Sequence, residues 1–97
     1  MAGYRFSEKA LDDLTEIWDY TIKEWSEKQA EKYYDLILST CKDLAVNPQL
    51  GKYYNVVTIN VLGYKCGQHI IFYQQALENQ IVIVRVLHVN MDLRNKI

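Results

Sequence analysis

The stretch Trp25-Ser26-Glu27-Lys28-Gln29 decides the fold of this 97-residue chain, because it separates one helix from the next. Ser26 followed by Gln29 three residues later is a capping-box pattern, in which the serine oxygen accepts a backbone N–H of the new helix. The segments on both sides of it carry apolar residues at helical spacing. We therefore predict two helices joined by a very short turn, which makes them an antiparallel helical hairpin.

Both predicted helices have recognisable ends. Ser7 is placed to cap the first helix, and Asn47-Pro48 ends the second, because the residue before a proline disfavours helical backbone. The predicted inward stripes are Ala10, Leu11, Leu14, Ile17, Trp18, Thr21, Ile22 and Trp25 in the first helix and Ala30, Tyr33, Tyr34, Ile37, Leu38, Cys41, Leu44 and Ala45 in the second. The first helix's outward face is predicted to be solvated, and it carries Asp12, Asp13, Glu16, Asp19, Lys23 and Glu24.

The rest of the chain is patterned for strands. Residues 2–6 alternate, residues 56–62 are β-branched and close at Gly63, and the runs 68–76 and 81–88 are joined by a short loop at 78–80. The 81–88 run is apolar on both faces apart from Arg85, which is typical of a central strand covered on both sides. The tail 89–97 is too short to form a stable helix unless it docks.

These elements predict a single α+β domain over residues 1–97 with the order β-α-α-β-β-β. The helical hairpin packs on one face of a largely antiparallel sheet. Because one hairpin cannot cover both faces, we expect apolar and aromatic surface to remain as a candidate partner site. The chain has eight tyrosines against two phenylalanines, a bias compatible with rings at the core edge or with a protein-binding surface.

Charge is balanced overall but divided along the chain. The net charge is −1, whereas residues 1–45 hold 6 basic and 10 acidic side chains and residues 46–97 hold 5 and 2. A small dedicated nucleic-acid binder is normally strongly basic, so the total argues against that class. No apolar run is long enough to span a bilayer and no signal peptide is recognisable, so we expect a cytoplasmic protein without a membrane partner.

The sequence motifs do not indicate any enzyme class. The chain lacks a Gly-x-Ser-x-Gly motif, a glycine-rich phosphate loop and metal-ligand spacing, so neither a cofactor nor a metal is expected. Cys41 and Cys66 are not in a Cys-x-x-Cys pair, and we interpret them as small buried hydrophobic residues.

Two polar residues of the last predicted strand stand out. Arg85 must find a partner or open onto a cleft, because burying a guanidinium costs several kcal/mol unless it is paired. Either it forms an ion pair, with Asp92 or a helix acid, or it faces an anion or a partner. His88 is either a strand-end hydrogen-bonding group or a general acid/base, although strict alternation places it on the face opposite Arg85 unless a bulge intervenes.

The order of these segments resembles the ParE-type toxins of the RelE/ParE superfamily. The resemblance is carried by the stretch from Leu14 to Tyr20 with Trp25, by Gln29-Ala30-Glu31-Lys32-Tyr33, by Asn47-Pro48-Gln49-Leu50-Gly51, by Gly67-Gln68-His69-Ile70-Ile71-Phe72-Tyr73 and by Arg85-Val86-Leu87-His88 with Met91-Asp92. It covers nearly the whole chain. It implies the toxin of a type II toxin–antitoxin system, neutralised in a hetero-oligomer by a ParD-like antitoxin whose C-terminal segment folds onto it.

Toxins of this superfamily divide by target. ParE-like toxins poison DNA gyrase by binding, whereas RelE-like toxins cut mRNA on the ribosome. Ribosome-dependent cleavage demands many Lys and Arg to dock on RNA phosphates and stabilise a charged transition state. With three arginines and a net charge of −1, this chain favours the gyrase branch and no direct contact with nucleic acid. A degenerate toxin that acts only with its antitoxin in operon regulation is a further alternative.

The resemblance places the target- or partner-binding residues at Arg85, His88, Asp92, Lys65 and Arg94. In the ribonuclease alternative, Arg85 stabilises the phosphate while His88 or Lys65 moves protons. Two departures from the family pattern concern activity: Gly63 stands where an arginine is usual, and the chain ends in Asn95-Lys96-Ile97 instead of Arg-His-Leu.

Overall fold

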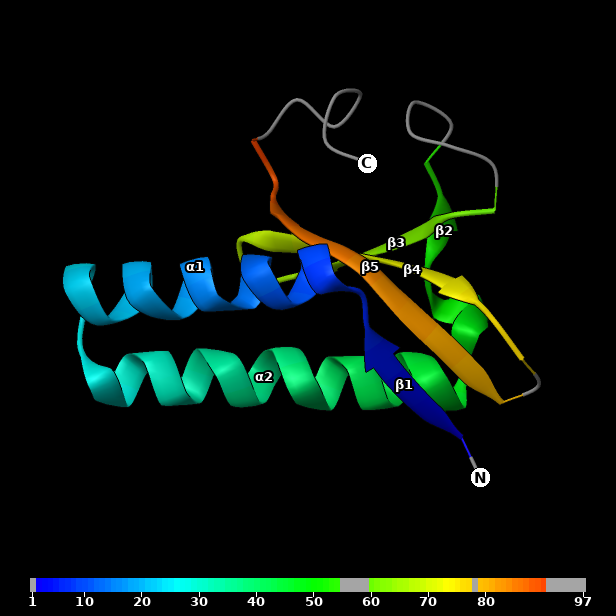
Figure 1. The fold of residues 1–97 in the computed structure, drawn as a ribbon, viewed down its shortest axis with the longest axis horizontal. Coiled ribbons are helices and arrows are strands. Elements are labelled where there is room, and N and C mark those ends of the chain that lie inside the picture. The colour runs from blue at the N-terminus through cyan, green and yellow to red at the C-terminus, as the bar shows by residue number, and fades with distance from the viewer. Residues whose placement is uncertain (1, 55–59, 78, 91–97) are drawn as a thin grey trace.

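A helical hairpin lies against one face of a mixed sheet (Figure 1). The computed structural model describes residues 2–54, 60–77 and 79–90. The described elements are, in order, β1 (Gly3–Phe6), α1 (Glu8–Glu24), α2 (Glu27–Val46), a 3-10 turn (Pro48–Leu50), β2 (Lys52–Tyr53), β3 (Leu62–Cys66), β4 (His69–Gln75) and β5 (Gln80–His88). These confirm the predicted α+β class and element order, with the two-residue β2 as an addition too short to show any periodicity.

The five strands of the described chain are ordered β1-β5-β4-β3-β2. β1 pairs with β5 in parallel, and the other neighbours are antiparallel. The predicted central position of the last strand is confirmed, because β5 lies between β1 and β4. The helix caps are also as predicted: Ser7 Oγ accepts the Ala10 N–H at 3.0 Å, and Ser26 Oγ accepts the Gln29 N–H at 3.1 Å.

The main core fills the space between the hairpin and the sheet. Its buried members come from both helices and from β3, β4 and β5, and they include Leu14, Ile37, Cys41, Leu44, Cys66, Ile71, Tyr73, Ile81, Ile83 and Val86. The Tyr73 hydroxyl donates to the Pro48 carbonyl at 2.7 Å and accepts the Gly51 N–H at 2.8 Å. A fully buried β4 side chain thereby holds the loop that follows α2. Both cysteines are buried free thiols, as interpreted from the sequence.

The other face of the sheet differs from the sequence-based expectation. Val61, Ile70, Phe72 and Leu87 form a second buried cluster there, with Tyr54 and Val89 packed against it. In the part of the chain that the structure describes, this face is therefore a small core instead of an exposed apolar surface. The exposed aromatic side chains of the described residues are Tyr20 and Trp25 in the hairpin and Tyr53 and Tyr64 on β2 and β3.

Gly63 does not end a strand, contrary to the prediction. Residues 56–59 of the predicted strand lie outside the described residues, and β3 begins at Leu62 and continues through Gly63 to Cys66. A Cβ at Gly63 would collide with the ring of Tyr54 and lie 3.1 Å from Cγ2 of Ile70. Tyr54 therefore occupies the space where the family's usual arginine side chain would start, which gives a packing reason for the glycine.

β5 contains a bulge just before Arg85. Phe72 of β4 pairs with Arg85 but Tyr73 pairs with Ile83, so Val84 is the extra residue. β1 stops at Phe6, opposite Ile83, and beyond that point α1 lies along the edge of β5. Ser7 marks the change: its N–H donates to the Ile83 carbonyl at 2.9 Å and its hydroxyl to the Val84 carbonyl at 2.7 Å.

Asp13 of α1 closes the remaining edge of β5. Its Oδ2 accepts the Val86 N–H at 3.0 Å and Nε of Arg85 at 2.8 Å, while its Oδ1 accepts Nη2 of Arg85 at 2.8 Å. Asp13 is 6% exposed and is the one buried charged residue within the described ranges. The sequence-based assignment of Asp13 to the solvated face is therefore wrong, because periodicity cannot show that a strand edge needs an acceptor.

Replacing Asp13 with Ala is expected to destabilise the protein by about 3 kcal/mol. The change leaves the Arg85 guanidinium and the Val86 N–H without this carboxylate, and breaking a buried ion pair typically costs about 3–5 kcal/mol. We take the lower end because the Arg85 side chain keeps 16% exposure. Urea unfolding measures the change. Asp12→Ala is the matched control, since Asp12 is exposed on the same turn, and it should cost less than about 0.5 kcal/mol. Equal losses in both variants would contradict the role of Asp13.

Candidate partner-binding surfaces

Arg85 is engaged in the structure by Asp13. The hydrogen bonds that Arg85 donates to Asp13 raise the pKa of the guanidinium, while desolvation opposes this shift, so Arg85 carries its charge at any physiological pH. The interpretation of Arg85 as half of an ion pair with a helix acid is confirmed. The alternative pairing with Asp92 involves a residue outside the described ranges.

His88 lies on the face of β5 that carries the helices. Its partner across the sheet is His69 of β4, and the two ring centres are 5.5 Å apart with an interplanar angle of 82°. Nδ1 of His88 accepts the Asn90 N–H at 3.2 Å, which agrees with a strand-end hydrogen-bonding role. The register is regular from Arg85 to His88, so the bulge does not bring these two side chains onto one face.

His69 is tied to α2 by Tyr33. Tyr33 Oη lies 2.6 Å from Nδ1 of His69 and accepts the Gln68 N–H at 3.0 Å. Desolvation, and then the neighbouring His88, lower the pKa of His69 to about 4, against a small opposite effect of Asp13. The imidazole is therefore neutral at pH 7, and the Tyr33 hydroxyl donates to the Cys66 carbonyl at 3.3 Å. Tyr33 also packs against the turn between β3 and β4, where Gly67 has φ 60° and a Cβ would lie 2.7 Å from the Tyr33 ring.

Lys65 lies on the opposite face of the sheet from His88. It is exposed on β3 and pairs with Ile70, whose side chain belongs to the second cluster on the face away from the helices. Lys65 and His88 are therefore separated by the sheet. Asp92 and Arg94, the other two predicted site residues, lie outside the described residues.

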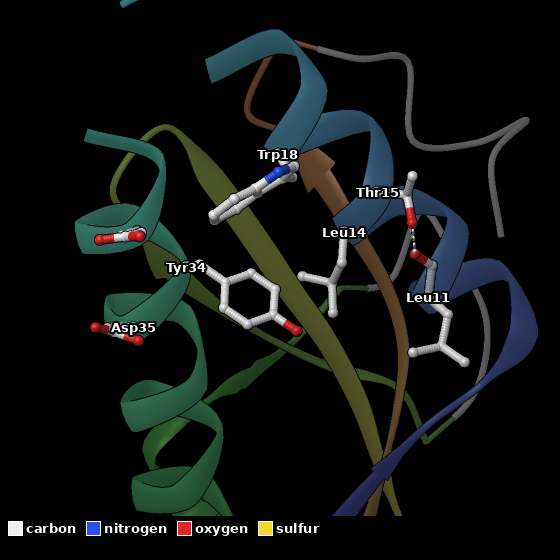
Figure 2. A pocket seen from close by; sticks show the side chains of 7 residues that line it. Leu11, Leu14, Thr15, Trp18, Tyr34 and Asp35 are labelled. Carbon is white, nitrogen blue, oxygen red and sulfur yellow. Dashed lines mark hydrogen bonds between the residues drawn. The ribbon is translucent and has the colours of Figure 1, made fainter. Parts of the chain in front are cut away.

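A groove that the sequence analysis did not predict runs between α1 and α2 (Figure 2). It encloses about 570 Å³ and is lined by Leu11, Leu14, Thr15, Trp18, Glu31, Tyr34 and Asp35. Trp18 and Tyr34 meet edge to face, with ring centres 5.8 Å apart, and Leu11 is 51% exposed. The apolar stripe of α1 is wider than the sheet can cover. The side of the stripe that carries Leu11 and Trp18 therefore lines this groove. The width of the apolar stripe of α1 was the feature of the sequence from which this groove could have been predicted.

A second cleft lies on the other side of α1, over the histidine pair. Its two adjoining parts, each of about 430 Å³, share Tyr20, His69 and His88. Trp25 lines one part and is 72% exposed, which contradicts its predicted inward position. The reason is visible in Figure 1, where the C-terminal end of α1 extends past the sheet.

The described residues contain no group of three or more His, Cys, Asp or Glu side chains arranged to hold a metal ion. None of the described helices has the length and apolar character needed to cross a membrane. What the described surfaces offer is an apolar groove with an acidic rim and an aromatic cleft with two histidines.

The burial of neutral His69 predicts an acid-sensitive fold. Its folded pKa of about 4 lies below the ordinary 6.5, so the unfolded chain binds the proton more tightly between these values. Stability is therefore complete above pH 6.5 and falls as the pH drops towards 4, by at most about 1.4 kcal/mol per pH unit from this group. Urea unfolding across this range measures the slope. His69→Gln should flatten it, and an unchanged slope in that variant would contradict the assignment.

Comparison with known proteins gives one consistent result. The family model for the ParE toxin of type II toxin-antitoxin system, parDE, matches residues 4–93. Toxin ParE1 of Mycobacterium tuberculosis is 34% identical over 90 residues, covering 93% of this chain and 92% of the relative. Toxin ParE1 of Caulobacter vibrioides is 31% identical over 94 residues, covering 97% of this chain and 96% of the relative.

The fold agrees as well. A solved structure described as the chromosomal ParDE TA system from P. aeruginosa superposes with a TM-score of 0.78 at 20% identity, covering 93% of this chain and 98% of that chain. The family match, with two relatives above 30% identity over nearly their full length, shows that this chain belongs to the ParE toxin family of type II toxin–antitoxin systems.

Proposed function

We propose that this ParE-family toxin acts by binding DNA gyrase, and that its antitoxin neutralises it by laying an amphipathic segment into the groove between α1 and α2. Membership of a parDE-type system implies an antitoxin as partner. The target and the docking groove are the additional elements of the proposal.

The observation that carries the choice of target is the separation of the ribonuclease candidates. Proton transfer to or from a reacting group needs the acid or base within hydrogen-bond reach, directly or through one water. Lys65 and His88 face opposite sides of the sheet, and Arg85 is held by Asp13 at the edge of β5. Neither candidate for proton transfer lies beside Arg85, because His88 projects from the opposite face of β5 and Lys65 is two strands away on β3. A toxin that works by binding a protein does not need these groups to lie together, and the low arginine content agrees with it.

The groove suits an amphipathic helix as occupant. Leu11, Leu14, Trp18 and Tyr34 offer apolar and aromatic surface, of the kind in which a helix places its anchors at i, i+3, i+4 and i+7. Glu31 and Asp35 of α2 line the groove, and Figure 2 labels Asp35 on that helix. Lys or Arg beside the apolar stripe of the partner would complement these carboxylates. A flexible antitoxin tail with that pattern would fold as it binds.

The gyrase proposal is tested with the purified toxin freed of antitoxin. We expect loss of supercoiling and accumulation of cleaved DNA when the toxin is added to gyrase at micromolar concentration, with mRNA left intact in a translation extract. Circular dichroism confirms that the sample is folded. Site-specific mRNA cleavage that is lost in Arg85→Ala but retained in Asp13→Ala, which breaks the same ion pair, would reject the proposal and support the ribonuclease alternative.

The groove is tested by calorimetric titration with the antitoxin encoded beside the toxin. Trp18→Ala should weaken binding about 30-fold or more, because a buried aromatic anchor contributes about 2 kcal/mol or more. Leu11→Asp should also weaken it, since it puts a charge into apolar surface that is already 51% exposed in the free toxin. Trp25→Ala is the matched control: it removes the same side chain outside this groove and should change affinity less than about threefold. A larger loss with Trp25→Ala than with Trp18→Ala would place the antitoxin on the other side of α1.

A further inference from the structure

His69 and His88 offer the second cleft two polar atoms that the fold itself does not use. The two residues are direct partners in the antiparallel ladder between β4 and β5, so their side chains share one face of the sheet. Both line both parts of the cleft, each of about 430 Å³. Among the described residues, neither ring makes a hydrogen bond through Nε2, and no buried side-chain nitrogen lacks a partner. Both Nε2 atoms are therefore reached by solvent and are open to a ligand.

The hydrogen bonds at Nδ1 decide which of the two rings presents a donor. The Tyr33 hydroxyl donates its one hydrogen to the Cys66 carbonyl at 3.3 Å, so the 2.6 Å contact with Nδ1 of His69 uses the hydrogen of that nitrogen. Nε2 of the neutral His69 ring is then an acceptor. Nδ1 of His88 accepts the Asn90 N–H at 3.2 Å, so the neutral His88 ring carries its hydrogen on Nε2. The pair therefore presents an acceptor beside a donor, with ring centres 5.5 Å apart.

A side-chain carboxamide matches this arrangement better than a charged group does. A carboxylate has acceptors only and meets the lone pair of His69, whereas a lysine or arginine side chain has donors only and meets the N–H of His88. The C=O and N–H of a trans peptide bond point to opposite sides of the chain, but the two histidines lie on one face of the sheet. The carboxamide of Asn or Gln carries an acceptor and a donor on neighbouring atoms, so one such group can satisfy both rings.

The walls of the cleft suit a protein as the source of that group. Tyr20 and Trp25 line the cleft with 64% and 72% of their surface exposed, and tyrosine and tryptophan are enriched among the residues that dominate binding energy in protein interfaces. The described residues that line the cleft include the carboxylates Asp13 and Glu16 and no lysine or arginine. Nucleic acid is therefore disfavoured, since its phosphates are held mainly by lysine and arginine. The antitoxin groove shares no lining residue with this cleft.

We propose that this cleft is the surface with which the toxin holds its target, and that an Asn or Gln side chain of the target binds between Nε2 of His69 and Nε2 of His88. The carboxamide donates an N–H to His69 and its carbonyl accepts the N–H of His88, while the rings of Tyr20 and Trp25 pack on apolar surface beside it. The identity of the target rests on the proposed binding of DNA gyrase. His88 thereby gains a binding role in addition to its hydrogen bond at the strand end.

The affinity of the antitoxin-free toxin for gyrase tests the surface. His88→Phe keeps an aromatic ring without the Nε2 donor and should weaken binding at least about tenfold, whereas His88→Gln restores an N–H near that position and should lose less. Tyr20→Ala should also weaken binding at least about tenfold. Tyr53→Ala is the matched control, because Tyr53 is equally exposed at 64% outside the cleft, and it should change affinity less than about threefold. Thermal unfolding checks the fold of each variant. Wild-type affinity in both His88→Phe and Tyr20→Ala would overturn the proposal.

A titration without gyrase tests the hydrogen-bonding chemistry separately. Long-range proton–nitrogen NMR spectra of the free toxin should show the hydrogen on Nδ1 of His69 and on Nε2 of His88. Butyramide should shift the Nε2 resonances of both rings, and the methyl ketone of the same shape, which has no N–H, should leave that of His69 in place. The opposite protonation in either ring, or equal effects of the two compounds on His69, would overturn the proposal. If butyramide shifts both rings but the toxin does not bind gyrase, the identity of the target is wrong and the carboxamide site is supported.

Discussion

The carboxylate of Asp13 is the constraint on which the arrangement of the molecule depends. β5 is a central strand only up to Ile83, because β1 ends there, and its last five residues would otherwise present an open edge. Asp13 supplies a hydrogen-bond acceptor at this edge: it accepts the Val86 N–H and two guanidinium hydrogens of Arg85. The bulge at Val84 precedes these donors, and Ser7 bonds the bulge to the start of α1. A helix thus replaces a strand as the neighbour of β5.

Fixing Asp13 against β5 also fixes the rotation of α1, and this creates two different surfaces. The side with Leu11 and Trp18 is turned towards α2 and lines the apolar groove, while the side with Ile17 and Tyr20 is turned towards β5 and lines the histidine cleft. A toxin that must bind both a neutralising partner and a target benefits from separate surfaces. The same constraint explains why Arg85 contributes to the framework: its strongest donors are engaged within the fold.

The division of charge along the sequence has a structural counterpart. The acidic first half forms the hairpin, whose carboxylates Glu31 and Asp35 line the groove proposed for the antitoxin. Of the three basic residues of the second half that the structure describes, Arg85 is held by Asp13, while Lys52 and Lys65 stand on β2 and β3, on the sheet face away from the helices.

The sequence by itself determined the local structure, that is, where the helices begin and end and which runs of residues form strands. The capping residues Ser7 and Ser26, the proline after Asn47 and the apolar periodicities act within a few residues, and they were sufficient to predict the hairpin, the strand runs, the α+β class and the family. What only the tertiary structure decided depends on residues far apart in the chain. Asp13 is buried because Val86, 73 positions later, needs an acceptor, and Gly63 is required because the Tyr54 ring fills its Cβ space. The grooves on either side of α1 were also decided only by the tertiary structure. The position of a helix on a sheet follows from packing and edge hydrogen bonds, which no local sequence pattern encodes.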